Sequence, residues 1–155
     1  MASTVTASTM TVTISESITL NGKNQGGTQT LSIPSIATVS RRIIDVPASE
    51  VEILAMSTAV AAGTFIESDV LYIRITNLDD TNHVTLLFKN ENNDEFAVKL
   101  DKGQTFIYNG DLSGGVVDTM DADSSALSVS LGDLVNVTAT ADTAACDVEV
   151  FVACK

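Results

Sequence analysis

The residues best suited to chemistry lie in one short stretch, YIRITNLDDTNHVTLLFKN, at residues 72–90. It holds the only histidine of the chain, His83, and the adjacent pair Asp79 and Asp80. A histidine beside carboxylates can serve acid–base or nucleophilic catalysis, but it needs a nucleophile and an orienting group as well. No serine or cysteine of this chain stands in the sequence context of a nucleophile turn. We therefore expect His83 to be a solvent-facing turn residue and the protein not to be an enzyme.

Acidic residues could also bind a metal ion. The stretch DTMDADS offers Asp118, Asp121 and Asp123, and loop carboxylates are ligands that Ca²⁺ accepts. The stretch lacks the glycine and the terminal glutamate of a helix–loop–helix calcium site. A solvated acidic loop is the simpler interpretation, with calcium binding as the alternative. For Asp79 and Asp80, a turn stabilised by Asn and Asp side chains explains the residues without a metal.

The two cysteines, Cys146 and Cys154, lie in the last extended segment of the chain. Extended chain would separate them by roughly 26 Å, whereas a disulfide needs Cα atoms within about 7 Å. They share strand parity with Val148, Val150 and Val152. We therefore expect two small core residues, and neither a disulfide nor a zinc site, since one histidine and two cysteines do not give a zinc-binding pattern.

Composition restricts the class of partner. The chain has 155 residues, with 8 Lys and Arg against 20 Asp and Glu, so its net charge is −12. This charge repels phosphate backbones and acidic membrane surfaces, and we expect no direct nucleic-acid or membrane partner. The first residues, MASTVTASTMTVTISES, lack the basic and apolar regions of a secretory signal, and no apolar run has the length of a membrane span. We expect a protein made in the cytoplasm.

Apolar and polar residues alternate with a period of two through most of the chain, which predicts strands. The alternation is clearest at residues 70–76, 84–89 and 95–100, and Asn-, Asp- and Gly-rich turns connect these runs. In the first run, Leu71 shares the parity of Ile73 and Ile75. With about ten short strands and no long helix, we expect an all-β fold, an antiparallel β-sandwich or a jelly-roll-like fold.

Two segments are less regular. Residues 1–10 show no apolar face, so we expect an extended or flexible arm at 1–10 and a single sandwich domain at 11–155. Pro34 is expected to end a short strand, because proline cannot donate to a strand ladder. The alternation at Val51–Ser57 favours a strand, while Ser49 and Glu52 have the spacing of a helix capping box and leave a short helix as the alternative.

The stretch LYIRITNLDDTNHVTLLFKN, followed by EFAVKLDKGQTFIYNGD, resembles small virion structural proteins of tailed bacteriophages. The family pattern is a strand that ends in an R-I-T-N-L-D hairpin, then a short strand, then an L-x-x-G-x-x-F edge. The resemblance covers residues 51–110, less than half of the chain. The matching residues are Arg74, Ile75, Thr76, Asn77, Leu78 and Asp79, followed by Leu100, Gly103 and Phe106.

The resemblance implies a capsid decoration or cement protein that self-associates, as a trimer for example, and binds the lattice of the major capsid protein. Its location would be the virion, on the capsid exterior, after synthesis in the cytoplasm of the host bacterium. A tail, adaptor or fibre component is the first alternative. A carbohydrate-binding sandwich is the second, which the lack of tryptophan disfavours. Tyr72 and Arg74 share the outward parity of their strand and are expected interface residues, with ordinary strand surface as the alternative.

Overall fold

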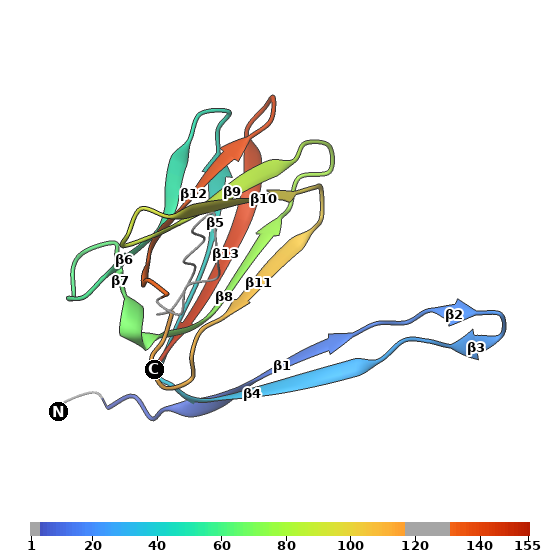
Figure 1. Cartoon of the computed structure of the whole chain (residues 1–155), viewed down its shortest axis with the longest axis horizontal. Helices are drawn as coiled ribbons and strands as arrows, with labels where there is room; N and C mark the ends of the chain where they lie inside the picture. Colours follow the sequence, from blue (N-terminus) through green and yellow to red (C-terminus); the bar gives the residue numbers. More distant parts are fainter. Residues whose placement is uncertain (1–3, 117–130) are drawn as a thin grey trace.

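Strands make up nearly all of the regular structure in the computed structural model, which describes residues 4–116 and 131–155. Two sheets pack into a sandwich, and a long hairpin projects from it (Figure 1). The prediction of an all-β antiparallel sandwich is confirmed. One sheet has the order β11-β8-β13-β5, from strands Thr105–Asn109, Val70–Asn77, Cys146–Cys154 and Thr38–Val46. The other has the order β10-β9-β12-β6-β7, from strands Glu95–Leu100, Val84–Asn90, Leu134–Ala141, Val51–Ser57 and Phe65–Ile66.

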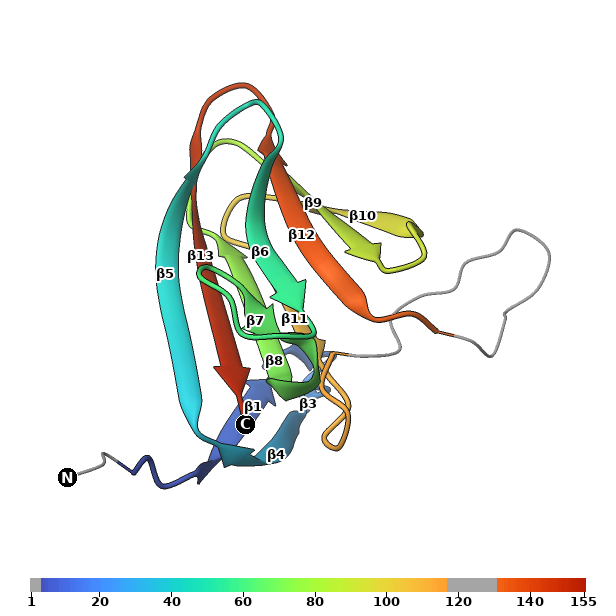
Figure 2. The ribbon, with the colours of Figure 1, turned by 90° about the vertical axis from the view of Figure 1, so that its left-hand side faces the viewer.

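The pairing of the sandwich strands is nested. β5 pairs with β13, β6 with β12, β8 with β11 and β9 with β10, all antiparallel. Strands from the first half of the sandwich therefore meet strands from the second half in reverse order, and most connections cross from one sheet to the other (Figure 2). The resemblance and the turn between two strand-like runs predict a hairpin at residues 72–90, and this prediction is wrong because β8 and β9 lie in different sheets. Alternation shows that each strand has one buried face, but it does not show which strand is the partner.

The main core lies between the two sheets and follows the predicted alternation in most strands. In β9, Val84, Leu86 and Phe88 are buried, and the Phe88 ring stacks on Phe96 with centroids 4.6 Å apart. Leu71 does not face this core with Ile73 and Ile75, as its parity suggested. The register shifts between Ala153 and Cys154, which pair with Tyr72 and Val70, and this bulge leaves Leu71 unpaired and turns it to the opposite side.

Two sequence expectations for single strands have clear outcomes. β6 spans Val51–Ser57, so the strand prediction is confirmed and the helix alternative is wrong. The strand expected to stop at Pro34 continues to Ile36, because a bulge accommodates the proline and Ser35 takes a positive φ of 64°. The structure divides the described residues into 13 strands rather than about ten, since β2, β3 and β7 are two-residue strands.

The projecting hairpin, which we call the arm, comprises residues 8–36. Its long strands β1 (Ser8–Ser15) and β4 (Thr28–Ile36) pair only with each other in the described chain, and the short strands β2 (Thr19–Leu20) and β3 (Lys23–Asn24) form its tip. The tip turns at Asn21 and Gly22, whose φ angles are 50° and 76°, as a two-residue hairpin turn of the primed type requires. The strand pairing thus divides the chain after residue 36, not at the expected boundary after residue 10.

The arm has one apolar face and one polar face. Val12 pairs with Leu31 and Met10 with Ile33 on the first, whereas the second is made of serine and threonine. Near its base the apolar face packs on the outer side of the β11-β8-β13-β5 sheet, away from the main core. The buried members of this second cluster are Ile33, Ile36, Leu71, Tyr72 and Ala153.

Candidate functional site

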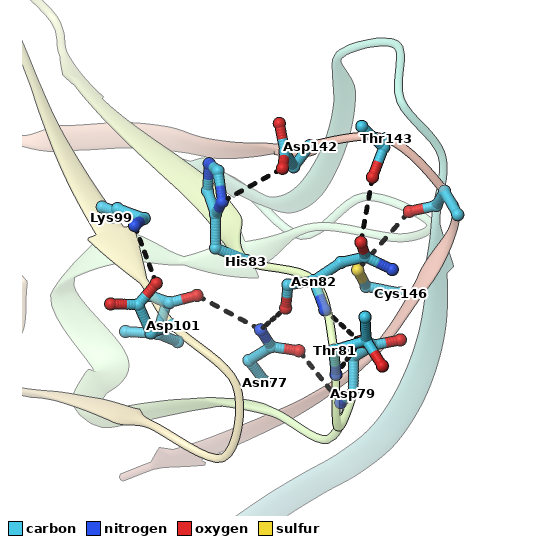
Figure 3. Close-up of polar contacts among 12 residues, drawn as sticks. Asn77, Asp79, Thr81, Asn82, His83, Lys99, Asp101, Asp142, Thr143 and Cys146 are labelled. Atoms are coloured by element: carbon cyan, nitrogen blue, oxygen red, sulfur yellow. Dashed lines mark hydrogen bonds and ion pairs between the residues drawn. The ribbon is translucent and has the colours of Figure 1, made fainter.

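The loop between β8 and β9, which contains His83, is held by a network of hydrogen bonds with neighbouring segments (Figure 3). We call this region the corner. The buried Asn77 side chain donates from Nδ2 to the carbonyl oxygens of Asn82 (2.9 Å) and Leu100 (3.2 Å), and its Oδ1 accepts from the amide of Asp79 (3.0 Å). Asp79 in turn accepts from the amides of Thr81 and Asn82 at 2.7 and 2.5 Å. These backbone donors stabilise the carboxylate and lower the pKa of Asp79. The expected turn is therefore built by its Asn and Asp residues.

His83 contributes to this corner as a structural residue. Its Nδ1 lies 3.5 Å from Oδ2 of Asp142, and its carbonyl oxygen accepts from the Asp142 amide at 3.1 Å. Its side chain is 29% exposed, so it is only partly solvent-facing. Cys146, which also lies at this corner, has a pKa raised by burial and by nearby carboxylates, Asp79 first among them. A protonated, buried thiol is a poor nucleophile.

Four aspartates surround a depression of about 450 Å³ beside this corner. Asp79 and Asp80 come from the turn, Asp45 from the end of β5 and Asp147 from the start of β13. Within residues 4–116 and 131–155, no group of three or more His, Cys, Asp or Glu side chains is arranged to hold a metal ion. The calcium candidates Asp118, Asp121 and Asp123 lie outside the described residues.

The outer face of the β11-β8-β13-β5 sheet carries the most distinctive charged group of the described chain. Glu149 is 5% exposed and lies between Arg41 and Arg74, with each nitrogen–oxygen distance 2.5 Å. The two guanidinium groups hold the pKa of Glu149 below its usual range. The Arg74 guanidinium also lies 5.6 Å from the centre of the Phe151 ring. This ion-paired group fixes side chains of three neighbouring strands on one surface.

The two expected interface residues are both on this outer face, in different surroundings. Arg74 is partly buried in the ion-paired group. Tyr72 is 4% exposed because the base of the arm covers it, and its ring meets Phe151 edge-on at 6.0 Å. Sequence reasoning missed Glu149, although the alternation in CDVEVFVAC places it on the face opposite the buried valines.

The outer face and the arm also expose apolar side chains. Val39 and Ile43 on β5 lie on either side of Arg41 in the same strand parity. Where the arm passes the β11 edge, a groove of about 280 Å³ lies between the arm and the sheet, and Ile14 and Ile107 line it. These apolar residues border the second cluster on both sides, which makes this surface the strongest candidate for an interaction site.

Cys146 and Cys154 are free and buried, as the core interpretation predicted. They begin and end β13, so the strand itself holds them apart. Burial raises the pKa of Cys154 to about 11, which keeps its thiol protonated at neutral pH.

Comparisons with protein-family models and with curated proteins identified no relative of this chain. Among the described residues, no helix has both the length and the apolar character needed to cross a membrane.

Proposed function

We propose that this chain is a non-enzymatic structural protein of a virion, a capsid decoration or cement protein of a tailed bacteriophage. The observation that carries the proposal is the combination of a nested sandwich with a projecting arm. Pairing of the first-half strands with the second-half strands in reverse order is the winding expected of a jelly roll, an architecture that viral capsid domains use. The resemblance of residues 51–110 to virion proteins supports the same function.

The arm supports an assembly role because a hairpin that projects into solvent is not stable by itself. A two-stranded hairpin is at best marginally stable in water, and among the described residues no sheet lies behind the distal half of this arm (Figure 1). Ile18 and Leu20 near its tip are about half exposed. A protein that assembles with neighbours covers such residues, and self-association together with binding to the capsid lattice supplies those neighbours.

The charge of the chain favours the outside of a capsid over its inside. At a net charge of −12, contact with packaged nucleic acid would be strongly repulsive. A position on the exterior, against the major capsid protein, avoids this repulsion. We therefore place the protein on the outer surface in this proposal.

Other roles on the same fold need different observations. Lectins also use jelly rolls, but sugar binding generally relies on exposed aromatic rings, and Tyr72 is buried beneath the arm. A tail, adaptor or fibre component would have the same sandwich and arm, and only its copy number would differ.

The test is the copy number of the chain in purified virions, by quantitative mass spectrometry against the major capsid protein. Abundance comparable to that of the capsid protein is the expected result for a decoration or cement role. A few copies per particle would assign the chain to the tail or a fibre. Absence from the particle would overturn the proposal, and binding to an immobilised glycan panel would then test the lectin alternative.

A further inference from the structure

Where the arm packs on the outer face, the buried apolar contact is flanked on two sides by exposed apolar residues, which we call its two open ends. The covered centre is the second cluster, in which Ile33 of the arm meets Tyr72 and Ala153 of the sheet. Beyond one end the apolar face of the arm continues to Ile14 and Ile18, which are 44% and 48% exposed. Beyond the other end, next to Ala153, the outer face continues on β5 to residues that are 52% and 60% exposed. These are Val39 and Ile43.

The two open ends cannot meet within one chain. The arm starts beside β5, crosses the sheet and leaves it past β11, and these two strands are opposite edges of the sheet. Figure 1 shows the tip of the arm pointing away from the sandwich. The exposed apolar residues of the arm and those of β5 therefore come together only when a second copy of the chain lies alongside the first.

The free part of the arm is long enough for such a contact. The turn at Asn21 lies seven residue steps beyond Ile14, which is about 23 Å of extended strand. A four-stranded sheet is about 14 Å wide between its outer strands, at about 4.8 Å per strand spacing. The tip can thus cross most of the outer face of a neighbouring sheet.

The arm is the nearly neutral part of a strongly negative chain, so it is the segment that can approach another copy with the least repulsion. The first 36 residues contain one acidic residue, Glu16, and one basic residue, Lys23, so the rest of the chain carries the whole net charge of −12. Two such bodies repel each other, whereas the neutral arm does not add to that repulsion. On the β5 surface Arg41 is ion-paired with Glu149 of its own chain, but its side chain is 67% exposed and can also meet Glu16 of another copy.

We propose that residues 14–29, the distal arm, dock on the β5 side of the outer face of a second copy, where they cover Val39 and Ile43. Each copy gives one arm and receives one, which closes either as a reciprocal two-fold dimer or, head to tail, as a ring when the rotation between copies allows it. The proposal rests on the self-association included in the proposed function and names the surfaces that carry it. It concerns the isolated chain and does not depend on the identity of the particle.

Disulfide trapping between two variants tests the contact. A tagged chain with Ile18→Cys is mixed in dilute solution with an untagged chain with Ile43→Cys, then concentrated and mildly oxidised. The native cysteines are buried and do not compete. Thr13→Cys in the tagged chain is the matched control, because Thr13 is exposed on the polar face of the same hairpin. We expect several-fold more tagged–untagged conjugate from Ile18→Cys than from Thr13→Cys, and equal yields would overturn the proposal.

A shortened arm gives an independent readout. Replacing residues 15–28 with Asn-Gly joins the paired residues Ile14 and Gln29 through a two-residue turn and keeps the packed base. Sedimentation velocity should show an oligomer for the full chain and a monomer for the shortened chain. An unchanged melting temperature at low concentration would show that the sandwich still folds. An oligomer that survives the shortening would overturn the proposal.

The tests of the arm contact and the virion test can fail independently of each other. A full chain that stays monomeric and gives no Ile18–Ile43 conjugate contradicts the arm contact, even if the chain is abundant in particles, and would mean that a different protein covers the arm. A trapped conjugate from a chain absent from particles supports the arm contact and contradicts the proposed function alone.

Discussion

The sandwich and the arm use the same alternation of apolar and polar residues but give their apolar faces different environments. In β9, Val84, Leu86 and Phe88 are almost wholly buried between two sheets. In β1, Met10 and Val12 are partly buried, and Ile14 is 44% exposed. Both regions thus form strands, but the apolar side chains are completely buried only in the sandwich. The sandwich therefore has a complete core of its own, whereas under the proposal above the distal half of the arm is covered by a second copy.

The largest expected effect is in the sandwich core. Phe88→Ala removes a ring that contacts Phe96 and Phe106, at 4.6 and 4.9 Å between centroids. We expect a loss of about 3–5 kcal/mol in the free energy of unfolding, measured by chemical denaturation at a concentration where the chain is monomeric. Val60→Ala, at a site 86% exposed, is the control. A loss below about 1 kcal/mol for Phe88→Ala would mean that the two sheets do not share this core.

A smaller effect is expected at the corner between the sheets. Asn77→Ala leaves the buried carbonyl of Leu100 without its donor and removes the acceptor of the Asp79 amide. Unpaired buried polar groups cost about 1–3 kcal/mol, and thermal or chemical unfolding measures this loss. The exposed substitution Asp80→Asn should change stability by no more than about 0.5 kcal/mol. Equal effects of the two substitutions would contradict the structural role of Asn77.

The ion-paired Glu149 predicts a dependence on pH. Its pKa is lowered in the folded state by Arg41 and Arg74, so its contribution is present above the unfolded pKa, about 4.3, and is lost as the pH falls through the lower folded value. Glu149→Gln should therefore destabilise the chain at pH 7, and the difference from wild type should shrink on acidification. Unfolding curves from pH 7 to pH 3 measure it. A difference that is constant over this range would mean that the ion pairs contribute no pH-dependent stability.

The smallest effect on folding stability is expected in the arm, where the effect on association is large. Ile18→Ser should change the unfolding free energy of the dilute chain by no more than about 0.5 kcal/mol, because this side chain is 48% exposed and lies outside both apolar clusters of the described residues. It should weaken association of the concentrated chain, measured by sedimentation. Added salt should strengthen association of the wild type, since it screens the repulsion between copies of charge −12. Association that weakens with salt would contradict this expectation, because it would show that attraction between charged groups outweighs the repulsion between copies.

The sequence predicts the strands better than their partners. Period-two alternation located β6, β9 and β10, and the Asn-Gly pair lies at the tip of the arm because both residues accept a positive φ. It could not show that β8 and β9 belong to different sheets, since that depends on long-range pairing. Nor could it show that the bulge at Leu71 turns this residue to the outer face, because a single unpaired residue leaves no mark in the alternation.

The candidate interaction surface shows the same limit. Tyr72 and Arg74 were predicted to face outward, and they do lie on the outer face of their sheet. Whether an outward residue is free depends on what covers it, and the arm that covers Tyr72 comes from residues distant in the sequence. The pairing of Glu149 with Arg41 and Arg74 likewise joins three strands that only the fold brings together.

Hydrogen exchange of backbone amides, measured at low and at high protein concentration, tests the central difference between the two regions most directly. We predict that the sandwich strands are protected equally at both concentrations, whereas residues 14–29 exchange rapidly in the dilute chain and slowly in the concentrated chain. Protection of residues 14–29 that does not change with concentration would contradict the account, because the distal arm would then be complete without a second copy.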